Sequence, residues 1–249
     1  MTASTTILGM PVSKLTSREL VNLIQVAIDS GNTLKIAYAN AHTLNMAYQD
    51  GVLGRIFHAF DLIHPDGIGV YWASRIMDRN DALPERMTGS DFYRLLVEYS
   101  LKNNWRLFFF GHSPEILGRL KDNSPGLNIV GLQEGYHFRD DEVIAAINRA
   151  HPDVLIVGLS CPKQEKWIHA HGDRLNTKVI LAVGDGIRVF SGDKLRGPRI
   201  LQRLGLEWFI RFLSNPVKHF RRYVIGNPLF ILRVLNAKRS GVRRKAPYQ

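Results

Sequence analysis

The feature that most constrains the fold is the alternation of short apolar runs with segments of helical periodicity between residues 34 and 183. The runs are apolar on both faces, as strands of a parallel sheet are when helices cover both of its sides. Strand–helix–strand units of this kind form right-handed crossovers within one sheet. The sequence therefore predicts an α/β fold with a Rossmann-like parallel sheet and helices on both faces. The expected strands are Leu34–Ala39, Leu62–His64, Arg106–Phe110, Asn128–Leu132, Val154–Gly158 and Val179–Val183.

Capping and turn residues mark the helices between these strands. Thr16–Glu19 has the pattern of a capping box ahead of an amphipathic segment that Gly31 is expected to end. A polar loop over Asp78–Gly89 leads to Ser90, the expected cap of the next helix. A short strand and turn are expected over Thr5–Val12. The other expected helices begin near Leu44 and Glu115 or cover Gly51–Phe60, Gly67–Met77, Asp140–Ala150 and Gln164–His171.

The pattern changes after Gly184, where helical segments follow one another without strands. These segments are Arg199–Leu213, Pro216–Ile225 and Pro228–Ala237, and Lys238–Gln249 is expected to be a disordered basic tail. Residues 194–249 hold 14 Lys and Arg against one acid, whereas residues 1–193 hold 19 against 21. We therefore predict a nearly neutral core over residues 1–193 and a basic C-terminal appendage over residues 194–249 that meets an anionic partner.

The appendage combines this charge with apolar side chains at helical spacings, which is typical of helices that lie in a membrane interface. We expect an anionic membrane surface as the partner, with Arg233 and the tail residues near it. Packing of the stripe on the core and nucleic-acid binding by the tail are the alternatives. Exposed apolar faces could also produce a homo-oligomer. The apolar residues are Phe209, Phe212, Leu213, Phe220, Val224, Phe230, Ile231 and Val234.

Several features indicate the compartment. The N-terminus lacks the basic and apolar regions of a signal peptide, and no apolar run approaches the roughly 20 residues of a spanning helix. The single cysteine, Cys161, excludes an internal disulfide and fits a reducing environment. We expect a cytoplasmic protein that is peripheral on the inner face of the plasma membrane.

The stretch Leu62–Gly69 contains the strongest candidate for chemistry. A strand runs through Pro65 into a single carboxylate, Asp66, and then into two glycines that open a helix. Ligands of open α/β sheets bind where strands pass into helices, so a carboxylate there suits a general base. An Asx turn or a helix cap is the alternative reading of Asp66, and a cap is also the alternative for Asn40.

Other motifs limit how an anionic substrate could be held. The sequence has no dinucleotide-binding fingerprint, Walker A loop, Asp-x-Asp pair or zinc-ligand spacing, so we expect no cofactor and no metal. A bound diphosphate would need arginines and helix N-termini. Arg86 followed by Thr88, Gly89 and Ser90 fits that need, with an ordinary surface loop as the alternative. Lys163 and Gln164 at a helix start are further candidates.

Several blocks follow one another over residues 39–223: Ala39–Asn45, Pro65–Gly67, Glu85–Asp91, Gly158–Glu165, Leu206–Trp208, Asn215–Pro216 and Arg221–Tyr223. Together these blocks resemble the WecG/TagA/CpsF family of bacterial glycosyltransferases. The resemblance has departures: Tyr38 replaces a frequent Thr, and Val189–Gly192 replaces the usual Phe-Asp, which leaves the role of Asp185 open. The Asn40 block and Gly226–Pro228 are most similar to the exopolysaccharide glucosyltransferase branch.

The resemblance implies an inverting, metal-independent enzyme that moves a sugar from a UDP-sugar to a saccharide on a polyprenyl diphosphate. Glucose is the favoured donor sugar, and N-acetylmannosamine and its uronic acid remain open. Asp66 matches the family's proposed catalytic base, and Asn40 and Gln164 match its loop asparagine and glutamine. The basic residues that match are Arg211, Lys218 and Arg221. A basic-tailed nucleic-acid-binding protein and a methyltransferase are the alternative functions.

Overall fold

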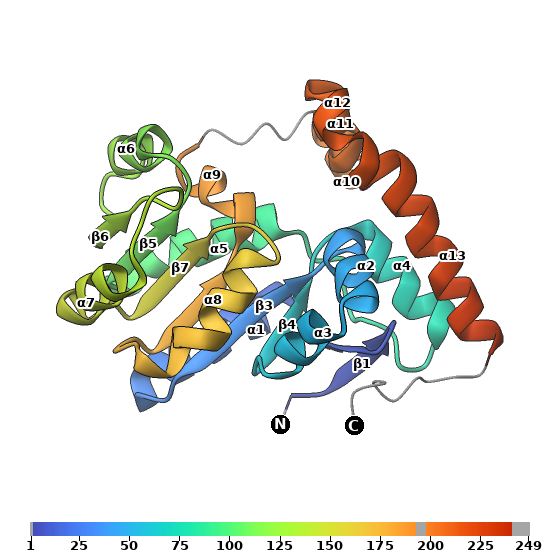
Figure 1. The fold of residues 1–249 in the computed structure, drawn as a ribbon, viewed down its shortest axis with the longest axis horizontal. Coiled ribbons are helices and arrows are strands. Elements are labelled where there is room, and N and C mark those ends of the chain that lie inside the picture. The colour runs from blue at the N-terminus through green and yellow to red at the C-terminus, as the bar shows by residue number, and fades with distance from the viewer. Residues whose placement is uncertain (1, 193–197, 241–249) are drawn as a thin grey trace.

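The computed structural model describes residues 2–192 and 198–240, and its centre is a parallel sheet of six strands in the order β4-β3-β8-β7-β5-β6 (Figure 1). The predicted fold class is confirmed. A separate antiparallel hairpin, β1 (Ser4–Ile7) with β2 (Met10–Ser13), precedes the sheet. The strands of the sheet are β3 (Leu34–Ala39), β4 (Leu62–Pro65), β5 (Leu107–Gly111), β6 (Ile129–Gln133), β7 (Val154–Gly158) and β8 (Val179–Ala182).

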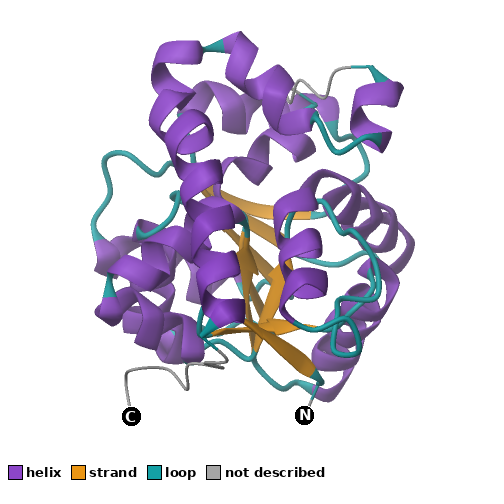
Figure 2. Ribbon diagram, turned by 90° about the vertical axis from the view of Figure 1, so that its right-hand side faces the viewer, coloured by secondary structure: helices purple, strands orange, loops and turns teal. Residues whose placement is uncertain are grey.

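Helices cover both faces of the sheet because successive strand side chains point to opposite sides (Figure 2). Phe108 and Phe110 belong to the core on one face, and Leu107 and Phe109 belong to the core on the other. The first face is covered by α2 (Ala41–Gln49), α3 (Gly51–His58), α4 (Ile68–Met77), α7 (Asp140–Ala150), α8 (Lys163–His171) and α13 (Gly226–Arg239). The second is covered by α1 (Ser17–Ser30), α5 (Gly89–Asn103), α6 (Pro114–Asn123) and α9 (Ile187–Phe190).

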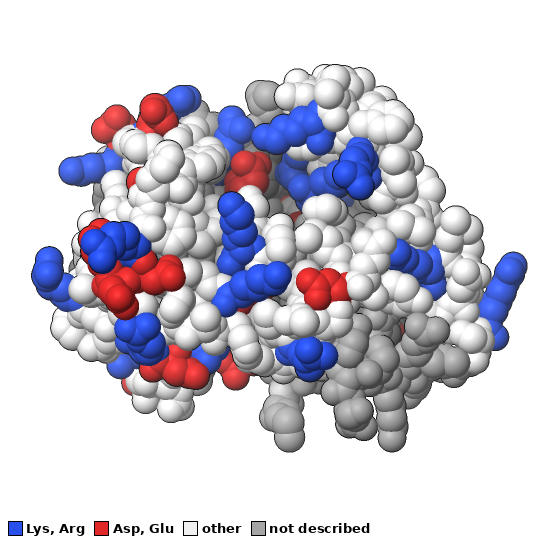
Figure 3. Space-filling view, in the orientation of Figure 1, with Lys and Arg blue, Asp and Glu red and all other residues white. Residues whose placement is uncertain are grey.

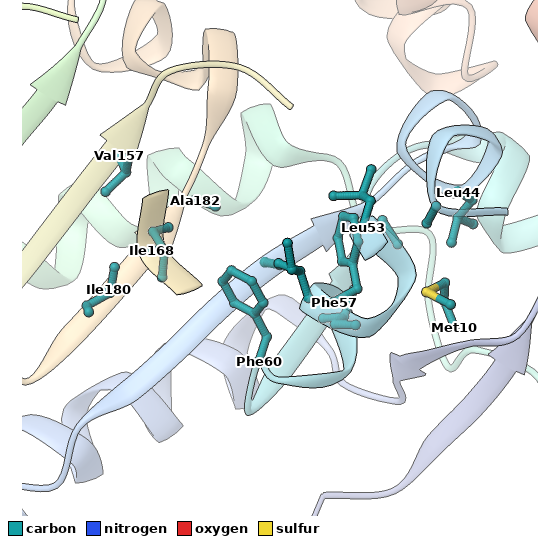
Figure 4. Close-up of a cluster of buried hydrophobic side chains, with 14 of the residues drawn as sticks. Met10, Leu44, Leu53, Phe57, Phe60, Val157, Ile168, Ile180 and Ala182 are labelled. Carbon is teal, nitrogen blue, oxygen red and sulfur yellow. The ribbon is translucent and has the colours of Figure 1, made fainter. Parts of the chain in front are cut away.

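The core on the first face is continuous from the hairpin to the middle of the sheet. Figure 4 shows Met10 and Leu44 at one end and Ile168, Ile180 and Ala182 at the other, with Leu53, Phe57 and Phe60 between them. Full burial of side chains of this size stabilises the fold by about 1.5–3 kcal/mol each relative to exposure. This packing fixes the positions at which the strands end.

Two helix starts lie earlier than the sequence pattern predicts. α2 begins at Ala41 rather than near Leu44, because Asn40 caps it and forms a capping box with Thr43. α5 begins at Gly89 with Thr88 as its cap, so Ser90 is inside the helix and not its cap. The capping box at Thr16 and the end of α1 at Gly31 are confirmed. Both corrected caps lie at the carboxyl end of the sheet and matter for the site described below.

The C-terminal segment is helical, as predicted, but its helix boundaries differ. Gly205, at φ +76°, separates α10 (Arg199–Arg203) from α11 (Glu207–Ser214), where one helix was expected. α12 (Pro216–Phe220) passes through a π-helical turn, η3 (Arg221–Ile225), directly into α13. Lys238 and Arg239 therefore lie in a helix, and residues 241–249 of the expected tail are outside the described residues.

α13 is attached firmly to the core and runs beside α2 and α4 (Figure 1). Phe230 and Val234 are buried beneath it, and the Asn45 side chain donates to the Gly226 carbonyl at 2.8 Å. The Arg233 guanidinium donates to Asn45 Oδ1 at 2.8 Å and lies over the Tyr48 ring. The expected apolar stripe is thus divided between buried and exposed residues, and Arg233 contacts Asn45 and Tyr48 on α2.

No helix within the described ranges is both long and apolar enough to cross a membrane.

Candidate active site

The site lies where three neighbouring strands end at the same edge of the sheet. Ala39 pairs with Pro65, so Asn40 and Asp66 follow paired positions of β3 and β4. The backbone N–H of Asp66 donates to the Ala39 carbonyl at 2.7 Å, which continues the ladder by one bond. Gly67 follows at φ +94°, a conformation that favours glycine and turns the chain sharply into α4. The register of the sheet therefore places the Asn40 and Asp66 side chains together.

The Asp66 carboxylate is half-buried and held from two sides. Oδ1 accepts a hydrogen bond from the backbone N–H of Gly89 at 2.8 Å, and Oδ2 accepts one from the Asn40 amide at 3.3 Å. Gly89 is the first residue of α5, so the carboxylate also lies at the positive end of that helix dipole. An ionised carboxylate has about four lone-pair sites at which it can accept hydrogen bonds. The arrangement orients a carboxylate that can still accept a proton from a substrate hydroxyl.

Asn40 performs two tasks that the sequence left as alternatives. Its Oδ1 accepts from the backbone N–H groups of His42 and Thr43, each at 3.0 Å, and its Nδ2 donates to Asp66. Because Oδ1 is occupied by the cap, the amide cannot be flipped without loss of those bonds. Asn40 is therefore a helix cap whose second hydrogen-bonding atom orients the carboxylate.

Replacement of Asn40 by Ser should separate these two tasks. Ser is as good a helix cap as Asn, so the free energy of unfolding should change by less than about 1 kcal/mol. Ser cannot reach Asp66 with a donor in the same way, and misplacement of a catalytic group by about 1 Å can cost about 10²-fold in rate, so turnover should fall by about 10- to 100-fold. Urea unfolding and steady-state kinetics measure the two effects. Turnover equal to that of the wild type would show that Asn40 is only a cap.

A cavity of about 800 Å³ opens beside Asp66, between the edge of the sheet, α4 and the C-terminal helices. Lys and Arg side chains gather around the hollow between the core and α10–α12 (Figure 3). Its charged and polar lining residues include Asn40, His42, Asp66, Arg86, Thr88, Gln202, Glu207, Arg211, Arg222, Tyr223 and Asn227. A chamber with one oriented carboxylate and several arginines suits a polyanionic substrate that carries a reacting hydroxyl.

The arginines enter this chamber from opposite sides. Arg86 Nη1 donates to the Gln202 carbonyl at 2.9 Å and so connects the loop before α5 to the appendage. Burial disfavours the charge of Arg211, but Tyr223, Asp185 and Asp66 outweigh it and raise the pKa of Arg211 above its ordinary value. Arg211 therefore remains charged among acidic neighbours. These contacts show that the appendage contributes cations to the chamber.

Asp185 lies at the same edge, after β8, and its role now has a structural basis. Gln164 Oε1 accepts from the Gly184 backbone N–H at 2.8 Å and holds the turn that carries Asp185. The Asp185 carboxylate is 3.7 Å from His112 Nε2 and raises the pKa of Arg211. Asp185 thus belongs to the electrostatic surroundings of Arg211.

His42 lies in the first turn of α2 and lines the cavity. Burial, with a smaller contribution from Arg222, lowers the pKa of His42 to about 4, so its ring is neutral at pH 7. In the unfolded chain the ring titrates near 6.5. As the pH falls from about 6.5 to 4, the unfolded state therefore binds a proton that the folded state does not, and stability decreases.

The His42→Gln variant should lose this part of the pH dependence. Its free energy of unfolding should decrease less between pH 7 and pH 5 than that of the wild type, because Gln does not titrate. Urea unfolding curves of the two proteins at both pH values make the comparison. Equal decreases in the two proteins would contradict the assigned shift.

The structure brings some of the predicted site residues together and separates others. Asn40, Asp66, Arg86, Thr88 and Arg211 line the cavity, and Gly89 donates to Asp66. Lys163 is exposed at the start of α8, and Lys218 and Arg221 are exposed on α12 and η3. Gln164 is fully buried. These four residues lie outside the cavity lining, and Gln164 acts through the Gly184 turn.

Sequence reasoning did not select Arg222 or Trp208 as site residues, although both lie in blocks that carry the resemblance. A π-helical turn has i→i+5 hydrogen bonds, which shift the direction of side chains relative to an α-helix. Here the shift directs Arg222, and not Arg221, into the cavity. Among the described residues, no three His, Cys, Asp or Glu side chains are grouped so that they could hold a metal ion.

A Rossmann-like sheet with a cavity at the carboxyl ends of its strands defines the class of open α/β proteins, whose ligands generally bind at this edge. Comparison with known proteins specifies the family: the model of the glycosyl transferase WecG/TagA/CpsF family matches residues 5–244. The chain belongs to this family, which confirms the resemblance seen in the sequence blocks.

Curated relatives cover most of the chain. One of Bacillus subtilis (strain 168) is 31% identical over 209 residues, 82% of this chain and 80% of that protein. Another, of Bacillus spizizenii, is 30% identical over 220 residues, 87% of this chain and 84% of that protein. One of Staphylococcus aureus (strain MRSA252) is 29% identical over 245 residues, 96% and 95% of the two chains. All three are called N-acetylglucosaminyldiphosphoundecaprenol N-acetyl-beta-D-mannosaminyltransferase.

Proposed function

We propose that the protein is an inverting glycosyltransferase that moves a sugar from a UDP-sugar to a saccharide on a polyprenyl diphosphate. The observation that carries this proposal is the Asp66 carboxylate, oriented by Gly89 and Asn40 at the wall of an arginine-bordered cavity. The names of the relatives support the acceptor class, because they describe an undecaprenyl diphosphate that carries a sugar.

The reaction needs one base and one site for a leaving anion. The acceptor hydroxyl oxygen attacks the anomeric carbon, its proton passes to Asp66, and the bond from that carbon to the UDP oxygen breaks. Attack opposite the leaving group inverts the configuration at the anomeric carbon. The departing diphosphate gains negative charge, and Arg211 and Arg222, which line the cavity, stabilise it. No step of this scheme requires a group that the chain does not supply.

The donor sugar is proposed to be glucose, on the likeness of the Asn40 block and Gly226–Pro228 to the exopolysaccharide branch. The relatives' names indicate N-acetylmannosamine for those proteins. The test is a panel of UDP-glucose, UDP-N-acetylmannosamine and UDP-N-acetylmannosaminuronic acid, each offered with a short polyprenyl-diphosphate sugar acceptor. The panel tests both the proposed reaction and the identity of the donor sugar. We expect transfer from UDP-glucose. Transfer only from another UDP-sugar of the panel would contradict glucose as the donor sugar, and transfer from none of them would overturn the proposed reaction.

We propose that the appendage binds the anionic surface of a membrane at its cytoplasmic face, as a lipid-linked acceptor requires. Several large apolar side chains are exposed on its helices, among them Leu213, Val217, Phe220 and Leu232. Exposed apolar groups beside Lys218, Arg221 and Arg239 fit a lipid interface better than a nucleic-acid backbone. Binding to anionic vesicles and to duplex DNA at matched salt separates the two, and a preference for DNA would favour the rival partner.

A further inference from the structure

The cavity beside Asp66 has an apolar wall that the transfer reaction itself does not use. α4 contributes Ile68, Trp72 and Ile76, and the facing wall contains Phe209 and Phe212 from α11 and Ile231 from α13. Ile68, Trp72 and Ile76 recur every four residues and therefore lie along one side of α4. The cavity is thus a groove with apolar sides that leads to a polar end at Asp66, Arg211 and Arg222.

Large apolar side chains in this groove are left open to solvent. Trp72 is 53% exposed, Ile231 52% and Phe209 41%. Apolar surface of this extent, bordered by charged groups, marks a site that another molecule covers. Gly205 packs closely against α4 at one point of this groove, because a Cβ there would lie 2.9 Å from the Ile68 Cβ. Glycine at this position therefore lets the segment between α10 and α11 approach α4 without a clash.

We propose that this groove binds the first isoprene units of the polyprenyl chain of the acceptor. The inference rests on the proposed function, which supplies the acceptor class. Such an acceptor has three parts in a fixed order: a sugar, a diphosphate and an apolar chain. The groove presents matching surfaces in the same order, with Asp66 for the sugar hydroxyl, arginines for the diphosphate, and the two apolar walls for the chain.

The apolar surface also continues out of the groove, which gives a long chain a path away from the protein. Ile225, Leu232 and Leu235 are exposed along η3 and α13, on the element that carries Ile231. A chain leaving along this element would meet the surface that we propose to face the membrane. Trp72 lies on the opposite wall, on α4, and therefore outside the C-terminal appendage. A variant of Trp72 changes the groove without changing the surface that we propose to face the membrane.

The experiment compares two acceptors that carry the same sugar diphosphate, one with a farnesyl chain and one with a methyl group. Wild-type kcat/KM should favour the farnesyl acceptor, and Trp72→Ser and Ile231→Ser should each reduce this preference by about tenfold, equivalent to about 1.4 kcal/mol. Leu101→Ser, a matched exposed residue on α5, should leave the preference unchanged. An unchanged preference in both groove variants would overturn the proposal.

Calorimetric binding of farnesyl diphosphate and methyl diphosphate, without any donor, provides a second readout that needs no catalysis. The wild type should bind farnesyl diphosphate more tightly, and the two groove variants should lose most of this difference. Absence of the difference in the wild type would refute the groove. A difference that depends on Trp72, in a protein that transfers no sugar, would support the groove and refute the proposed reaction instead.

Discussion

Replacement of Asp66 by Asn should lower the turnover of sugar transfer by about 10²–10⁴-fold, the usual contribution of a positioned general base. An amide cannot take the proton of the acceptor hydroxyl. The Asn side chain can still accept from the Gly89 N–H, but its amide nitrogen then faces the Asn40 Nδ2, and two donors meet where a donor met an acceptor. The resulting decrease in the free energy of unfolding should be smaller than the increase in the activation free energy of sugar transfer.

Two measurements keep this result interpretable. Urea unfolding shows whether the Asp66→Asn protein is folded, and calorimetric titration with UDP shows whether its nucleotide site survives. We expect a folded protein that binds UDP and transfers sugar at a greatly reduced rate. A folded variant with nearly normal turnover would remove Asp66 from the chemistry and return it to the role of a turn residue.

Replacement of Arg211 by Ala should lower turnover by about 10²–10³-fold, even with a water-soluble acceptor that needs no membrane. Arg211 lines the cavity and its charge is favoured by Asp185 and Asp66, and we propose that it stabilises the diphosphate as it leaves. Stabilisation that develops in the transition state affects kcat more than KM. Initial rates measured over a range of UDP-sugar concentrations give kcat and KM separately.

The control for Arg211 is Arg239→Ala, which removes an exposed arginine from the same appendage outside the cavity. It should keep kcat with the soluble acceptor within about twofold, because exposed charges at a distance contribute little. Similar losses in both variants would show that the appendage acts through its overall charge.

Point substitutions are easier to interpret than deletion of the appendage, because deletion would also expose the hydrophobic core that Phe230 and Val234 cover.

The sheet and the position of Asp66 could be predicted because they follow from local patterns. Apolar runs fix the strands, and a carboxylate after a strand must lie at the carboxyl edge of a parallel sheet. The pairing of Asn40 with Asp66 follows from strand order and register, which a single sequence does not determine. Both residues could therefore be predicted as site residues from the sequence, but the hydrogen bond between them could be seen only in the three-dimensional structure.

The limits of prediction are clearest where several residues could perform the same task. Thr88 and Ser90 can both cap a helix, and only the packed loop decides that Thr88 does so. Arg221 and Arg222 are equal as charges, and the π-helical turn decides which one faces the cavity. Gln164 lies at the start of a helix, where a polar side chain is usually exposed, yet it is buried and accepts a hydrogen bond from the Gly184 N–H. In each case tertiary contacts choose among residues of equal local propensity.

The most direct test of the account is a crystal structure of the protein with UDP bound. It should show the diphosphate within hydrogen-bonding distance of Arg211 or Arg222, with its terminal phosphate directed toward Asp66 in the cavity between the sheet edge and the appendage. UDP bound instead at the exposed start of α8, around Lys163, would contradict the assignment of this cavity as the site of sugar transfer.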